Sequence, residues 1–305
     1  MNHTLKITLL LVALFFFSQI FGLAVVRQYM NIVRGTAVDP LTNQTVIVTN
    51  ITFNALPFNM ERPEVEESTS FVYIIIAILI GTLILLAMIR FKKVALWKAW
   101  YFLAVTLCLS IALAPFLSTL IAFVVSMIAA YYKVLNPKIA VHNMTELFVY
   151  GGLAAIFVPI MNMLSAIILL ALLSGYDMIA VWKTKHMVNL AKFQTQNRVF
   201  AGLMVPYKRA KQGAIRAGAT VVKTKINTAI LGGGDIGLPL IFAGVVMKGL
   251  IMQNPALGFY KALIIPATAA IALLLLFLKS QKGKFYPAMP FLSIGCIAGW
   301  VLTLI

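Results

Sequence analysis

Acidic side chains are scarce in this sequence. Its 305 residues include 8 aspartates and glutamates against 25 lysines and arginines, and only 11% of the residues are charged. Soluble globular domains carry about 25% charged residues, because their surfaces face water. The apolar share is correspondingly high, at 62%. This composition excludes an ordinary soluble enzyme and predicts an integral membrane protein.

Metal ligands are also few. The chain has two cysteines, Cys108 and Cys296, and three histidines, His3, His142 and His186. Both cysteines lie inside apolar runs, so they do not indicate a redox compartment, and none of these residues has metal-ligand spacing. Because a zinc or haem site needs several such side chains close together, we expect no metal and no other cofactor.

Long apolar runs, by contrast, are abundant, and about 20 apolar residues suffice to cross the hydrocarbon core. The clearest runs are Leu5–Val26, Phe71–Ile89, Ala95–Leu113, Phe116–Tyr132, Thr228–Met247, Gly258–Leu278 and Tyr286–Leu304. The run 145–182 is about twice as long as one crossing and contains Pro159, so two spans, 145–160 and 162–182, fit it better. The sequence therefore predicts an all-α polytopic membrane protein with nine transmembrane helices.

The basic residues indicate how these helices are oriented. With the N-terminus cytoplasmic and the C-terminus outside, 20 of the 25 basic residues fall on the inner side. Treating 145–182 as one span would move the ten basic residues from Lys183 to Lys225 outside, against the positive-inside bias. We therefore predict a multi-pass protein of the cell membrane in this orientation. The first run also resembles a signal peptide, but its length and the lack of a clear cleavage site favour a retained helix.

Two polar segments divide the chain. Residues 27–70 form an outer loop with a strand-like stretch, Thr45–Phe53. Residues 183–225 form a basic cytoplasmic loop, which we expect to be attracted to anionic lipid. It has few aromatic side chains for stacking on bases, so we expect no nucleic acid partner. The loop separates a six-helix part, 1–182, from a three-helix part, 226–305.

Two carboxylates lie within the apolar spans. Asp177 lies six residues before Lys183, about 9 Å along a helix from the inner boundary. Asp235 follows Lys225 by ten residues, about 15 Å if that stretch is helical. Both therefore belong to the inner half of consecutive antiparallel spans, where their side chains can meet. A charged carboxylate at this depth costs several kcal/mol, so such residues are candidates for function.

Two carboxyl groups in contact share one proton over a range of pH, because both cannot ionise easily. This is the charge state that aspartic-type hydrolysis requires. One aspartate acts as a base on a water that attacks the amide carbon, while the other donates a proton to the carbonyl oxygen.

The residues around these positions are also unusual for membrane helices. Gly232, Gly233 and Gly234 precede Asp235 and permit close backbone approach or local unwinding. At the same predicted depth, the two prolines of Tyr286–Pro290 prevent a regular helix. Irregular backbone is tolerated in a membrane only where it lines a cavity or is buried in protein.

Three short motifs carry a resemblance to a known family. Tyr176-Asp177 resembles the Y-D motif, Gly232-Gly233-Gly234-Asp235 matches G-x-G-D, and Pro287-Ala288-Met289 is close to P-A-L. Their order and their spans are those of presenilins and signal peptide peptidases. The chain resembles an archaeal homologue of this family over all nine predicted spans. One departure is Met289 in place of leucine, an apolar residue of similar size.

The resemblance implies a presenilin-like fold and an intramembrane aspartyl protease that cleaves single-span transmembrane peptides within the lipid bilayer. It implies that Asp177 and Asp235 are the catalytic pair. The residues that it implies in support of the active site and substrate are Tyr176, Gly232, Gly233, Gly234, Pro287, Ala288 and Met289. The predicted orientation is similar to that of presenilin, whereas Gly234–Pro239 is more similar to signal peptide peptidase.

Two other readings remain open from the sequence. A proton-coupled transporter or cation channel would use the same two acids to bind protons or ions. The sequence shows no internal repeat to support this alternative. The alternative also leaves Tyr176-Asp177 and Pro287–Pro290 unexplained. In a structural scaffold, the acids would only hold helices together. The sequence also leaves open the substrates, the need for partner subunits, a homo-oligomer, and cleavage of the 183–225 loop.

Overall fold

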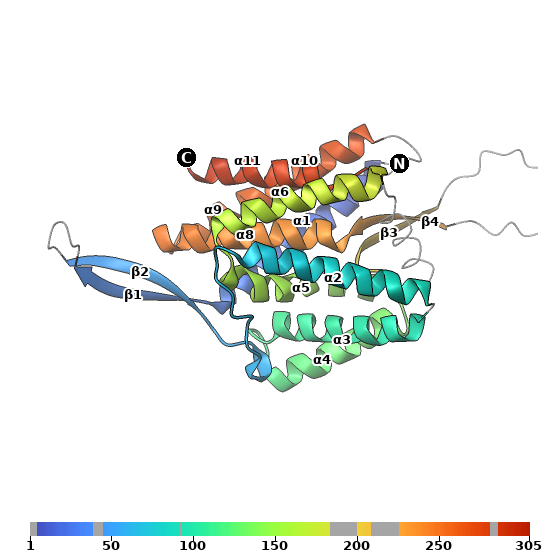
Figure 1. Ribbon diagram of the computed structural model, residues 1–305, viewed down its shortest axis with the longest axis horizontal. Helices are drawn as coiled ribbons and strands as arrows, with labels where there is room; N and C mark the ends of the chain where they lie inside the picture. Colours follow the sequence, from blue (N-terminus) through green and yellow to red (C-terminus); the bar gives the residue numbers. More distant parts are fainter. Residues whose placement is uncertain (1–4, 39–44, 92, 184–199, 209–225, 281–285) are drawn as a thin grey trace, which may run out of the picture.

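The computed structural model describes residues 5–38, 45–91, 93–183, 200–208, 226–280 and 286–305. The long helices run roughly side by side in one bundle, with the two ends of the chain at opposite ends of the helices (Figure 1). The helices are α1 (Leu5–Tyr29), α2 (Ser70–Arg90), α3 (Val94–Leu113), α4 (Thr119–Val134), α5 (Ile139–Phe157), α6 (Met163–Met178), α8 (Gly233–Gln253), α9 (Gly258–Ala262), α10 (Ile264–Lys279) and α11 (Met289–Thr303).

The described part of the chain confirms a largely helical membrane protein and places an apolar helix at each of the nine predicted spans, of which seven have the full length of a crossing. Seven helical segments there have the length and apolarity to cross a membrane, with α9 and α10 together forming one of them. The shorter apolar helices α4 and α11 account for the other two. The 145–182 run divides as expected. Its break consists of a 3-10 turn at Val158–Ile160 and an N-cap at Asn162, whose side chain accepts a hydrogen bond from Ser165 N.

Two antiparallel β-hairpins complete the fold. The outer hairpin, β1 (Met30–Val38) with β2 (Thr45–Phe53), projects beyond the bundle (Figure 1) and contains the strand expected from the sequence. The inner hairpin pairs β3 (Gly202–Lys208) with β4 (Ile226–Gly232) at the opposite end.

The inner hairpin corrects two boundaries predicted from the sequence. The seventh span begins at Gly233 instead of Thr228, because residues 226–232 bond to β3 and cannot also form helical hydrogen bonds. The basic segment 183–225 is also not loop throughout, since it contains β3. The rest of that predicted loop, 184–199 and 209–225, lies outside the described residues.

Helix α8 lies at the centre of the bundle, and 72% of its apolar window is buried, against 6% for α2. Glycines let neighbouring helices approach closely, as is common in membrane proteins. A Cβ on Gly151 of α5 would lie 3.1 Å from Gly22 Cα of α1. A Cβ on Gly295 of α11 would lie 2.9 Å from Ala269 Cα of α10. The central position of α8 places Asp235, near its start, inside the bundle.

Candidate active site

Asp177 lies near the end of α6, and its side chain is only 3% exposed. The backbone N–H of Met289 donates a hydrogen bond to Asp177 Oδ2 over 3.2 Å. Met289 is the first residue of α11, and the first N–H groups of a helix have no partner within the helix. The start of α11 therefore supplies Asp177 with a donor that the helix itself cannot use.

The two prolines explain why this donor is available. Pro287 is buried and precedes the helix, and Pro290 occupies its first turn. Neither has an N–H group, and proline is tolerated at the position of Pro290 because an N–H there would have no partner within the helix. The Ala288 backbone also lies against the Asp177 carboxyl group. The predicted irregular segment is thus confirmed for residues 286–288, which lead to the first aspartate, whereas Met289 and Pro290 already belong to α11.

Asp235 is the third residue of α8. Gly232, the N-cap residue, has an extended backbone, with φ −65° and ψ 150°. The Asp235 carboxylate lies against the Gly232 backbone, as an acidic side chain at this position commonly does. A Cβ on Gly232 would lie 3.3 Å from Asp235 Oδ2. The acid at the third helical position and the glycine at the cap therefore fix each other.

Asp177 and Asp235 come from α6 and α8, and these two helices contact each other and α11. The two aspartates lie close enough for a charge on Asp177 to act on Asp235. One turn from Asp177, Ser174 Oγ of α6 lies 2.8 Å from Ser293 Oγ of α11. This second contact joins the same two helices as the bond between Met289 and Asp177. Helix α11 is thereby held against the first aspartate at two successive turns.

The other predicted site residues occupy different surroundings. Tyr176 is half-buried next to Asp177. A Cβ on Gly234 would meet nothing within 4 Å, so this side of the α8 start faces open space. A Cβ on Gly233 would instead lie 2.6 Å from Tyr150 Oη. The structure thus places Asp177 against the start of α11, with Asp235 near enough for their charges to interact, while Gly233 faces α5.

Several polar residues near the site were not predicted. Gln19 of α1 is fully buried and donates a hydrogen bond over 2.8 Å to the carbonyl of Ile236, next to Asp235. Glu146 lies about two turns into α5 and is 1% exposed. It forms an ion pair with Lys133, which is buried in α4. The four-residue spacing of His142, Glu146 and Tyr150 places them on one helix face and could have revealed this group.

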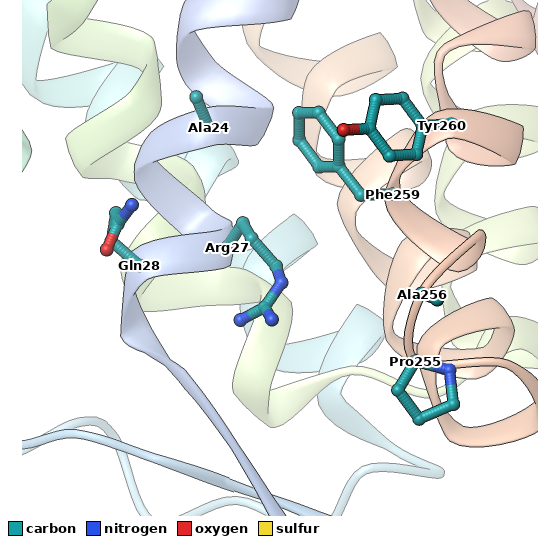
Figure 2. A pocket seen from close by; sticks show the side chains of 7 residues that line it. All are labelled: Ala24, Arg27, Gln28, Pro255, Ala256, Phe259 and Tyr260. Carbon is teal, nitrogen blue, oxygen red and sulfur yellow. The ribbon is translucent and has the colours of Figure 1, made fainter.

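A cavity of about 440 Å³ lies at the other end of the bundle. Figure 2 shows Arg27 of α1 facing this space, with Phe259 and Tyr260 on its far side. Helix α8 separates this end from Asp235 by about 30 Å, the length of its 21 residues. The cavity therefore lies apart from the two aspartates. Within the described ranges, no group of three or more His, Cys, Asp or Glu side chains could hold a metal ion; His3 and His186 lie outside those ranges.

A family model described as "Signal-peptide peptidase, presenilin aspartyl protease" matches residues 40–305. The chain belongs to this family. Two solved structures of a presenilin family intramembrane aspartate protease, in space groups C222 and P2, have the same fold, with TM-scores of 0.61 and 0.58. Both are 17% identical to this chain; they cover 97% and 100% of it, and the alignments cover 98% of each of them. No curated protein matches the chain in sequence.

Membership in this family confirms the predicted class of enzyme. The chain is an intramembrane-cleaving aspartic endopeptidase and an integral, multi-pass membrane protein that acts on transmembrane segments within the bilayer. None of these comparisons supports the alternative of a transporter or channel.

Proposed function

We propose that Asp177 and Asp235 are the catalytic pair of this protease. The observation that carries the proposal is their placement: the two carboxyl groups come from the contacting helices α6 and α8, close enough for a charge on one to act on the other, and Asp177 accepts a hydrogen bond from the start of α11. Since the two groups repel each other when both are charged, they share one proton. The pair then holds one base and one acid, as amide hydrolysis requires.

In the proposed reaction, the ionised aspartate takes a proton from water as the water oxygen attacks the amide carbon. The protonated aspartate gives its proton to the carbonyl oxygen, which yields a tetrahedral diol. Breakdown of the diol re-forms a carbonyl and breaks the C–N bond, and the amide nitrogen receives a proton from the pair. The two products are a carboxylic acid and an amine, and the pair returns to its starting state.

The substrate has to be unwound locally, because the amides of a helix are shielded by their own hydrogen bonds. We propose that a single-span substrate passes the open side of Gly234 as an extended segment, pairing with backbone near Gly232–Gly234. Pro287, Ala288 and Met289 support the site by keeping an N–H group free for Asp177. Tyr176 supports it from α6.

The finer features of the topology and assembly are proposals as well. We propose that the N-terminus is cytoplasmic and the C-terminus outside, supported by the positive-inside bias and by termini at opposite ends of the bundle (Figure 1). Location in the cell membrane, archaeal origin, the division at 183–225 and a homo-oligomer stay predictions. The mass of the purified protein in detergent would test the homo-oligomer.

The catalytic assignment is tested with the purified protein and a fluorescent single-span peptide in detergent micelles. We expect cleavage by the wild type and its complete loss in Asp177→Asn and in Asp235→Asn, because either change removes one half of the acid–base pair. Both variants should bind the peptide as the wild type does. Undiminished cleavage by either variant would contradict the assignment.

A further inference from the structure

Helix α5 carries a row of buried polar side chains that the proposed reaction does not use. His142, Glu146 and Tyr150 follow one another at four-residue spacing, and they are 4%, 1% and 5% exposed. Polar groups in an apolar span are costly unless they find partners. Their partners therefore show what the row holds in place.

Glu146 lies at the centre of this row. Its Oε1 atom is paired with Lys133 of α4 and accepts a hydrogen bond from Tyr101 of α3 over 3.3 Å. Its Oε2 atom accepts a hydrogen bond from Tyr150. Lys133 also bonds to Thr145 Oγ1 over 3.2 Å. Both oxygens of the carboxylate are thus engaged, and the single hydroxyl proton of Tyr150 has a fixed acceptor.

Tyr150 in turn lies along the first turn of α8. A Cβ on Gly233 would be 2.6 Å from Tyr150 Oη and 3.2 Å from its Cε1 atom. One turn further, a Cβ on Gly237 would be 3.5 Å from Tyr150 Cδ1. Gly233 is the first residue of α8 and lies two residues before Asp235. The tyrosine ring therefore sets how closely the start of α8 can approach α5.

His142 and its neighbour Asn143 hold strand β3, which pairs with the strand that leads into α8. The His142 ring lies 2.7 Å from the carbonyl oxygen of Gly202. The Asn143 amide both donates to the Met204 carbonyl, over 2.7 Å, and accepts from the Met204 N–H, over 3.0 Å. Strand β3 is thereby bonded to α5 through its backbone, and the N–H of Gly233 bonds to Ala201 O over 3.0 Å.

We propose that Tyr150, oriented by the Lys133–Glu146 pair, is a positioning residue that sets the place of the Asp235 carboxyl group relative to Asp177. This inference rests on the proposed catalytic pair. Tyr150 acts on the reaction only through Gly233 and the start of α8. A catalytic group displaced by about 1 Å can lose about a hundredfold in rate, so a contact two residues from Asp235 is able to affect turnover strongly.

The first test is a double-mutant cycle on the contact between Gly233 and Tyr150. In Gly233→Ala, the added methyl group meets the tyrosine hydroxyl and displaces the start of α8, so kcat should fall about tenfold or more. In the Tyr150→Phe background the hydroxyl is absent, so Gly233→Ala should lower kcat by a several-fold smaller factor. An equal loss of kcat in both backgrounds would overturn the proposal.

The second test separates positioning from general stability. Tyr29 is a matched control, because it is 4% exposed and its hydroxyl donates a buried hydrogen bond to the Ile111 carbonyl over 2.7 Å. Tyr150→Phe should lower kcat about tenfold with KM unchanged. Tyr29→Phe should lower the Tm by a similar amount and leave kcat unchanged. Equal kcat values for the two variants would overturn the proposal, and this comparison decides alone if Gly233→Ala does not fold.

The aspartate variants measured in parallel keep the two hypotheses apart. Cleavage that survives in Asp177→Asn or Asp235→Asn would refute the catalytic pair and, with it, the role of Tyr150. If both aspartate variants are inactive while Tyr150→Phe behaves like Tyr29→Phe, only the positioning role is refuted.

Discussion

The two hairpins lie at opposite ends of the bundle and are held in different ways (Figure 1). The outer hairpin, β1–β2, is attached mainly at its base. There, Asn54 N donates to Tyr29 O over 2.9 Å, and the Arg62 guanidinium lies 5.8 Å from the ring centre of Phe53. Val33, near the middle of β1, is 48% exposed.

The inner hairpin, β3–β4, belongs to the core. Leu203 and Ala229 are fully buried, and Val205 and Leu231 are 5% and 3% exposed, so alternate residues of both strands face the bundle. Strand β4 continues without a linker into α8. A disturbance of the inner hairpin should therefore reach Asp235, whereas the outer hairpin can change without affecting the site.

The largest expected difference between the two ends concerns their ion pairs. Lys133→Met would leave Glu146 buried without its cation, which should lower the free energy of unfolding by about 3–5 kcal/mol. At the outer end, Lys248→Met removes the partner of Glu67, which is 51% exposed, and should cost less than about 1 kcal/mol. Unfolding in detergent with added denaturant measures both. A loss below 1 kcal/mol in Lys133→Met would contradict the importance of the inner pair.

A glycine substitution in each hairpin makes a finer comparison. Gly202 begins β3 with φ +139°, a conformation that other residues rarely adopt, and a Cβ there would lie 3.1 Å from the Gly232 carbonyl carbon. Gly202→Ala should therefore cost about 1–3 kcal/mol and lower cleavage. In β1, a Cβ on Gly35 would meet nothing within 4 Å, so Gly35→Ala should change neither the Tm nor kcat. Equal effects at both positions would remove the distinction between the hairpins.

The smallest expected effect is at the base of the outer hairpin. Arg62 Nε donates to Ala155 O over 3.2 Å, and its guanidinium lies over the rings of Tyr29 and Phe53. Burial lowers the pKa of Arg62 because it disfavours the charged form. An apolar replacement avoids this cost of burying a charge, which offsets part of the stability lost with the Arg62 contacts. Arg62→Met should lower the free energy of unfolding by about 1 kcal/mol or less and leave kcat unchanged. A marked fall in kcat would show that the outer end is coupled to the site.

Much of the site could be predicted from the sequence because its residues are unusual where they stand. In an apolar span, Asp177 and Asp235 are conspicuous, since a carboxylate there is costly. The prolines of Tyr286–Pro290 likewise indicated a non-helical segment, because they remove backbone donors. These signals are local, and each depends on a few neighbouring residues.

Other parts of the site could not be predicted in this way. Residues 226–232 continue into an apolar run, and hydropathy alone does not separate a buried strand from a helix. Their strand character depends on pairing with residues 202–208. The same error affected the predicted position of Asp235 along its helix. The sequence placed it about three turns into a helix, whereas it lies in the first turn of α8.

The sequence by itself determined the class of the molecule: a multi-pass membrane protein whose long apolar runs contain two acids, with most of its basic residues between those runs. Hydropathy and charge act additively along the chain, so they can be read without knowing the fold. Only the tertiary structure decided which groups satisfy the buried acids, because a hydrogen bond or ion pair requires two atoms to meet in space. It joined Met289 to Asp177, and through Glu146 and Tyr150 it placed the start of α8 against α5.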